Sequence, residues 1–309
     1  MTSTSLRLDR GRPVAPSDGV LSPLGIDDVR IRGGFWADRQ ALNAQALIEH
    51  CEYWVERAGW VANFDAARDG RLPQAHTGRE FADSDVYKLL EAMAWEIGRT
   101  GDEAMNERFQ AIVERIAPVQ EADGYLNTFF GRPGQAPRYS DLEWGHELYC
   151  YGHLIQAAIA RGRTVGADLL VDIARRAADH VCDTFGVGGI ERVCGHPEIE
   201  VALAEFARYT GDDKYLEQAR LFTYQAGAAA GYPEARAALP LQRRTVREVN
   251  RIVEDLGRTP AFEAERTSDV DRVLPGLGDV RSRTDFVRFA HELEAVAKAA
   301  RAELPPAIP

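Results

Sequence analysis

The chain has 309 residues, of which 45% are hydrophobic and 28% are charged, a composition typical of a globular protein. Its net charge of −11 argues against nucleic acid or an anionic membrane as a partner, because both attract basic surfaces. There is no apolar run of about 18 residues, so no membrane span is expected, and the first twenty residues lack the apolar core of a secretory signal.

The four cysteines favour reduced thiols over disulfides. None forms a C-x-x-C pair, and no secretion signal is evident, so a cytoplasmic protein is expected. The spacing also disfavours a zinc site built from these four side chains alone. They are Cys51, Cys150, Cys182 and Cys194.

Residues 1–30 are expected to form a loose lead-in, because prolines and glycine interrupt any helical pattern there. The first predicted helix covers residues 35–57. Residues 59–82 contain several glycines and a proline and are expected to form a loop.

A helix–turn–helix pattern then occurs three times. The first copy begins at an expected N-cap cluster, Asp83-Ser84-Asp85, and its first helix stops at Gly101. Apolar residues recur with helical period in every copy. The predicted helix pairs cover residues 83–100 and 103–117, 146–162 and 168–185, and 198–209 and 214–225.

Repeats of about 50–60 residues built from helix pairs favour a toroid of helical hairpins over an open solenoid, whose common repeats are shorter. Few strand signals are present, so the fold class is mostly α. The long loops before the first helices, at 123–139 and 194–198, are expected to meet at one rim. The pattern stops near residue 230, and residues 231–309 are expected to form a divergent helical tail with helices at 241–256 and 284–304.

The stretch 143–154 concentrates reactive and aromatic side chains at the start of a predicted buried helix. Trp144, His146 and Glu147 lie in its first residues, where a helix that only packs has no need of them. This position predicts the mouth of a binding site.

Five motifs in order resemble the catalytic domain of glycoside hydrolase family 127, the β-L-arabinofuranosidase-like group. The resemblance covers roughly residues 30–228, so residues 31–230 are interpreted as the N-terminal half of the family's barrel. The motifs are Phe35-Trp36, the run from Asp83 to Ala92, the run from Asp123 to Thr128, the block from His146 to Leu154, and the run from Gly195 to Glu200.

The resemblance implies a partial (α/α)6-type barrel and a retaining glycoside hydrolase that acts on arabinofuranosides. It also implies a zinc-bound cysteine nucleophile and a glutamate acid/base in the full family domain. The family's substrate-binding histidines match His146 and His196, which are therefore expected to contact sugar hydroxyls. Trp144 and Tyr125 are candidates for stacking on the sugar, with simple packing as the alternative.

This chain departs from the family pattern at the catalytic residues. It has no Glu-x-Cys followed by a Cys-Cys pair, so no nucleophile, acid/base or zinc ligand is assigned. A glycoside hydrolase lacking its catalytic half, and inactive alone, is therefore one expectation. The alternative is a non-catalytic sugar-binding protein, or a half-barrel scaffold that requires a second chain.

Other polar residues in these motifs have structural explanations. His153 follows His146 by seven residues on the same helix face and is expected to be a core histidine bonded to a neighbouring helix. Glu147, Glu198 and Glu200 are either general acids or carboxylates that interact with a helix N-terminus, and the second interpretation is favoured.

Overall fold

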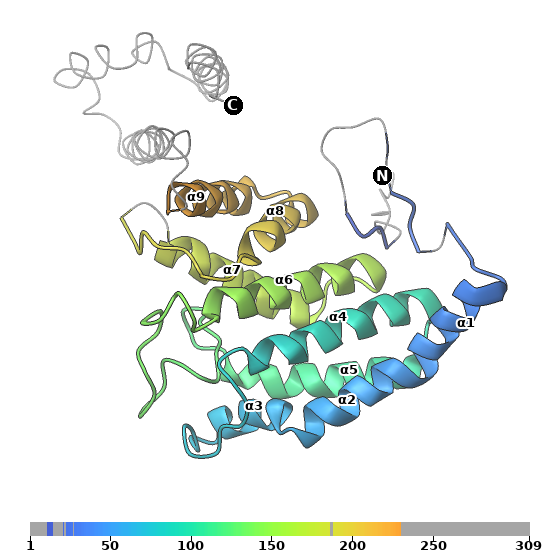
Figure 1. The fold of residues 1–309 in the computed structure, drawn as a ribbon, viewed down its shortest axis with the longest axis horizontal. Coiled ribbons are helices and arrows are strands. Elements are labelled where there is room, and N and C mark those ends of the chain that lie inside the picture. The colour runs from blue at the N-terminus through green and yellow to red at the C-terminus, as the bar shows by residue number, and fades with distance from the viewer. Residues whose placement is uncertain (1–10, 15–20, 22, 27, 186–187, 230–309) are drawn as a thin grey trace, which may run out of the picture. The chain divides into compact units, whose positions relative to one another are not determined.

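The computed structural model describes residues 11–14, 21, 23–26, 28–185 and 188–229, and the regular elements in these ranges are all helical (Figure 1). The predicted mostly α class is confirmed. None of the helices described here is both long enough and apolar enough to cross a membrane. The predicted tail, residues 231–309, lies outside the described ranges.

The α-helices are joined by connections of very different length. A π-helical stretch, η1 (Asn43–Leu47), links the first two helices, and a 3-10 turn, η2 (Ala117–Val119), follows the fifth. The α-helices are α1 (Gly34–Leu42), α2 (Ile48–Arg57), α3 (Trp60–Arg68), α4 (Ala82–Thr100), α5 (Glu103–Ile116), α6 (Glu147–Thr164), α7 (Leu169–Phe185), α8 (Ile199–Thr210) and α9 (Asp213–Ala229).

The prediction of a loop over residues 59–82 is wrong for its first part, which forms α3. Gly59 adopts the left-handed region at φ 79°, which separates α2 from α3 without a steric penalty. Val61 and Phe64 are fully buried, so packing stabilises this short helix despite the glycines that follow it.

The three predicted hairpins are confirmed as α4–α5, α6–α7 and α8–α9. The first helices lie in one row, in which α6 packs between α4 and α8 (Figure 1). Helices α5, α7 and α9 belong to the other side of the hairpins, with α7 packed on α6 and α9. This arrangement agrees with the helical barrel that the sequence predicts.

Glycine ends α4 and α8, the first helices of two hairpins, as predicted. Gly101 and Gly211 follow α4 and α8 in the left-handed region, at φ 71° and 73°. Asp102 then caps α5, because its carboxylate accepts a hydrogen bond from the Met105 N–H at 2.9 Å. Short connections of this kind hold each pair of helices side by side.

The predicted cap of α4 at residues 83–85 is wrong, because the helix already begins at Ala82. Asp83 is buried and accepts hydrogen bonds from the Thr128 N–H at 2.9 Å and the Thr128 hydroxyl at 2.6 Å. Burial raises its pKa to about 6. Asp83 therefore fastens the loop before α6 to the first turn of α4.

Candidate functional site

The loops that precede α4, α6 and α8 meet at one rim, as predicted. The Gly195 N–H donates to the Leu142 carbonyl at 2.8 Å, which joins the loops before α8 and α6. The ring of Phe81, just before α4, lies 5.4 Å from the ring of His146. These contacts bring segments from three hairpins to one place.

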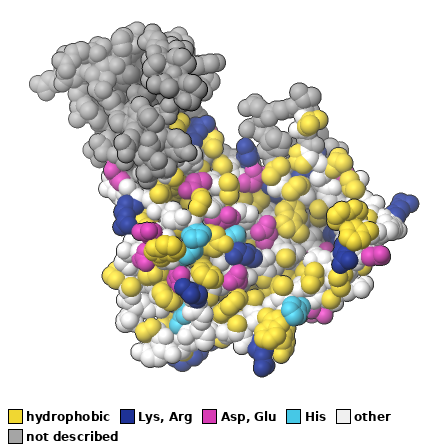
Figure 2. Space-filling model, viewed as in Figure 1, with side chains coloured by type: hydrophobic (Ala, Val, Ile, Leu, Met, Phe, Trp, Pro, Cys, Tyr) yellow, Lys and Arg dark blue, Asp and Glu magenta, His cyan; other side chains and the backbone are white. Residues whose placement is uncertain are grey.

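The structure brings together the two histidines that the sequence selects. The ring centroids of His146 and His196 lie 4.3 Å apart with the planes tilted by 40°. His146 is 6% exposed, whereas His196 is exposed on the surface. On the face drawn in Figure 2, histidine side chains lie beside hydrophobic and charged ones. We call His146 and His196 the histidine pair.

His146 has an unusual backbone conformation. It precedes the first residue of α6 in the left-handed region, at φ 58°. Its Nδ1 contacts the Trp144 carbonyl and lies 3.7 Å from the Glu80 carboxylate. A non-glycine residue in this region is held against a local strain of about 1 kcal/mol, so the surrounding contacts fix the ring's direction.

Tyr149 connects the histidine pair to His153, which lies one turn further along α6. Its ring centroid lies 5.5 Å from His146, 5.9 Å from His196 and 4.6 Å from His153. The Lys88 ammonium, from α4, lies 5.0 Å from the centre of the same ring. The result is an aromatic wall with one cation above it, a surface suited to a polar ligand with an apolar face.

His153 lacks the hydrogen-bond partner expected for it. Neither ring nitrogen has one, and its Nδ1 lies 3.7 Å from the Glu198 carboxylate. Burial, assisted by the charge of Lys88, lowers its pKa to about 4, so the ring is neutral at pH 7. Burial raises the pKa of Glu198, and the nearby Glu91 raises it further.

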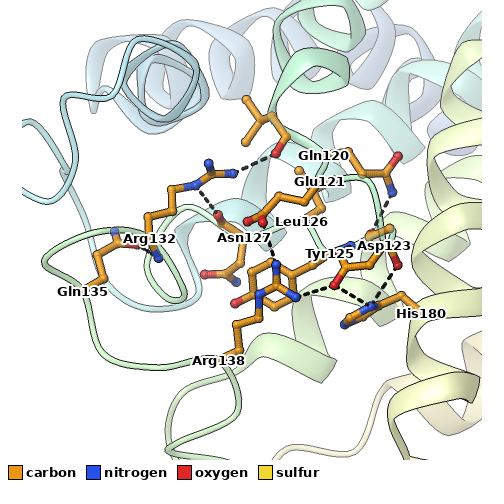
Figure 3. Close-up of polar contacts among 12 residues, drawn as sticks. Gln120, Glu121, Asp123, Tyr125, Leu126, Asn127, Arg132, Gln135, Arg138 and His180 are labelled. Carbon is orange, nitrogen blue, oxygen red and sulfur yellow. Dashed lines mark hydrogen bonds and ion pairs between the residues drawn. The ribbon is translucent and has the colours of Figure 1, made fainter.

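The two aromatic candidates occupy opposite environments. Trp144 is 61% exposed on the loop next to the histidine pair, so its ring is accessible. Tyr125 is fully buried, with the Arg138 guanidinium 3.9 Å from the centre of its ring (Figure 3). The expected stacking of Tyr125 on a sugar disagrees with this position, because neither face of the ring is open to a ligand.

Glu147 is the first residue of α6, the helix N-terminal position expected for it, and its side chain is buried. It is 1% exposed and accepts hydrogen bonds from the Tyr125 hydroxyl at 2.5 Å and the Tyr139 N–H at 2.7 Å. Burial raises its pKa to about 7, and the two hydrogen bonds oppose that rise. Glu147 therefore bonds two residues of the loop before α6 from within the core.

The donor set among the described residues does not fit the zinc that the resemblance implies for the full domain. No group of three His, Cys, Asp or Glu side chains in these ranges is arranged to hold a metal ion. Burial raises the pKa of the Cys150 and Cys194 thiols.

Sequence reasoning missed Tyr149 and Lys88 as parts of this surface. A signal was present in the spacing, because residues 146, 149 and 153 follow one another at helical intervals on one face. The position of Lys88 opposite that face depends on how α4 packs against α6, which no local pattern specifies.

Comparison with known proteins identifies the family of this chain. Residues 28–302 match the family model described as "Beta-L-arabinofuranosidase, GH127 catalytic domain". The chain belongs to glycoside hydrolase family 127. The match to the family model continues past residue 230, whereas the five motifs described above all lie before that residue.

Two similar proteins are described as β-L-arabinofuranosidases. A non-reducing end β-L-arabinofuranosidase of Bifidobacterium longum subsp. longum is 38% identical over 162 residues, which are 50% of this chain and 24% of that protein. A crystal structure of a GH127 β-L-arabinofuranosidase from Geobacillus stearothermophilus T6 has a TM-score of 0.61 and 29% identity, covering 76% of this chain and 36% of that one.

A second solved GH127 β-arabinofuranosidase has a TM-score of 0.62 and 27% identity, covering 71% of this chain and 35% of the other. The chain thus spans about a quarter of the curated relative and about a third of each of these solved chains. The comparisons therefore show which family the domain belongs to. The activities named above are those of the longer relatives.

Proposed function

We propose that this chain supplies the sugar-binding rim of a family 127 glycoside hydrolase domain that acts on β-L-arabinofuranosides. The observation that supports this most directly is the contact between the rings of His146 and His196, 4.3 Å apart. Imidazole nitrogens donate and accept hydrogen bonds, as hydroxyl groups do, so two adjacent rings suit neighbouring hydroxyls of one sugar.

The surroundings of the pair are consistent with a small neutral ligand. The exposed indole of Trp144 offers a face for the apolar side of a sugar ring, and Tyr149 provides a second aromatic wall. The Lys88 ammonium lies over the Tyr149 ring and is paired with Asp85, and the Glu198 carboxylate accepts a hydrogen bond from the Gln156 amide. Neither the nucleophile nor the acid/base is assigned, so binding is the step that these residues explain.

Removing either imidazole is expected to weaken sugar binding. His146→Ala and His196→Ala should each raise the Kd for methyl β-L-arabinofuranoside about tenfold, because each variant loses one or two hydrogen bonds to the ligand. Isothermal titration calorimetry measures this directly. His50→Ala is the matched control, because His50 is an exposed histidine on α2 that contacts Trp54.

Unchanged affinity in both His146→Ala and His196→Ala would remove the basis for the proposal, as would the absence of binding by the natural chain. Hydrolysis is a separate question. We propose that cleavage needs the catalytic part of the family domain, and that the chain alone binds the sugar without releasing the aglycone of an aryl arabinofuranoside.

A scaffold that pairs with a second chain is the other candidate function. The segment α1–α2, which is labelled in Figure 1, exposes large aromatic side chains: Phe35 is 60% exposed, Trp36 70%, Tyr53 55% and Trp54 50%. A surface of this kind is typical of an interaction site. We propose that a second copy of the chain covers it.

Self-association through this surface is expected to depend on Trp36 and Trp54. Multi-angle light scattering should show mass increasing with concentration for the natural chain, and a monomer for the double variant Trp36→Glu and Trp54→Glu, because buried charge opposes association. A natural chain that stays monomeric at the highest concentration tested would refute the scaffold function.

A further inference from the structure

Glu147 ties the loop before α6 to the helix at two separate points. Its Oε1 accepts from the Tyr125 hydroxyl at 2.5 Å, and its Oε2 accepts from the Tyr139 N–H at 2.7 Å. Tyr125 lies near the start of the loop, beside Arg138 and His180 (Figure 3), and Tyr139 lies fourteen residues later in the chain. A single buried carboxylate therefore sets the distance between two parts of the loop.

The backbone on both sides of the segment 140–145 is held in the left-handed region. Tyr139 has φ 57° and His146 has φ 58°, and both are non-glycine residues. Such residues keep this conformation only where neighbouring contacts impose it. At Tyr139 the contacts are the N–H bond to Glu147 and the bond of its hydroxyl to His180 Nε2 at 2.8 Å.

The same segment determines where the second histidine lies. The Leu142 carbonyl accepts from the Gly195 N–H at 2.8 Å. Gly195 also has no space for a side chain, because a Cβ there would lie 2.1 Å from the Glu143 carbonyl oxygen. A shift of residues 142–143 must therefore move Gly195, and with it the adjacent His196.

We propose that Glu147 is a positioning residue that holds His146 and His196 in contact by bonding Tyr125 and Tyr139. It does not touch the ligand, since it is buried beneath the rim. The carboxylate orders the segment between two strained residues, and that segment carries His146 at one end and supports His196 at its centre. The consequence for sugar affinity rests on the proposed function, whereas the consequence for the ring contact does not.

The test compares two substitutions of similar size. Glu147→Leu removes both acceptors, and Glu147→Gln keeps a carbonyl for the Tyr139 N–H and an amide that donates to the Tyr125 oxygen. The nuclear Overhauser effect between the imidazole protons of His146 and His196 should disappear in Glu147→Leu and return in Glu147→Gln. The Kd for methyl β-L-arabinofuranoside should rise about tenfold in the first and recover to within about threefold in the second.

Glu96→Leu is the control for loss of a buried carboxylate, since Glu96 is 6% exposed and paired with Arg99 in α4. It should destabilise the fold but retain the ring contact. If Glu147→Leu does not fold, Tyr125→Phe removes one donor alone and should weaken the Overhauser effect and raise the Kd about threefold.

The outcomes separate the two proposals. The positioning role is overturned if folded Glu147→Leu retains the contact between the His146 and His196 rings. It is also overturned if Glu96→Leu loses that contact too. If Tyr125→Phe is the variant used, an unchanged Overhauser effect does the same. A natural chain that shows the ring contact, loses it in Glu147→Leu and yet binds no arabinofuranoside supports the positioning role and refutes the proposed function.

Discussion

Phe206→Ala is expected to lower the free energy of unfolding by about 3–5 kcal/mol, the range for truncating a buried phenylalanine. Phe206 is fully buried on α8. Its ring lies 4.9 Å from Tyr215 of α9 and 6.1 Å from Tyr209. Removing it leaves a cavity between the two helices of the last described hairpin, because rigid aromatic neighbours fill such a space poorly.

Urea unfolding followed by circular dichroism measures this loss. Val201→Ala is the matched control on the same helix, since Val201 is 61% exposed and its truncation should change stability by no more than about 0.5 kcal/mol. A loss below about 1 kcal/mol for Phe206→Ala would mean that α8 and α9 are not packed in solution as they are in the structure.

The stability of the natural chain relative to Glu147→Gln is expected to fall as pH rises. Burial raises the pKa of Glu147 from 4.5 to about 7, so the folded state binds its proton more tightly than the unfolded state does. The stabilisation from that proton is fully present below pH 4.5 and is lost as pH rises through about 7. The free energy of unfolding that depends on this proton is about 3 kcal/mol.

Glutamine does not ionise, so Glu147→Gln escapes this loss. The difference in unfolding free energy between the two proteins, measured in urea at intervals from pH 4.5 to 8, should move in favour of the variant by up to about 3 kcal/mol. Asp83, whose pKa burial also raises, is present in both proteins and cancels in the difference. Parallel stability curves over this range would contradict the expected ionisation of a buried Glu147.

The hairpins were predictable because their signals are local. Apolar residues with helical period mark α4, α6 and α8, and glycine in a left-handed conformation ends α4 and α8. Helix α3 was missed because glycines and a proline surround a short helix, and burial of Val61 and Phe64 stabilises it. The helix propensity of the local sequence does not predict that these two side chains are buried.

The candidate site was only partly predictable for the same reason. Resemblance to the family selected His146 and His196, but their contact depends on two loops about fifty residues apart in the chain. Whether an aromatic or acidic side chain in such a loop faces solvent or the core is decided by tertiary packing. Tyr125 packs in the interior, which was the alternative to stacking on a sugar, and its hydroxyl donates to the buried Glu147 carboxylate.

The conformation of His146 bears on how this position changes during evolution. Glycine and asparagine adopt a positive φ with less strain than histidine does. A lineage that no longer required the imidazole would be free to drift toward those two residues at position 146. Histidine retained there against its own backbone preference would then distinguish homologues under selection for the ring from those that keep only the fold.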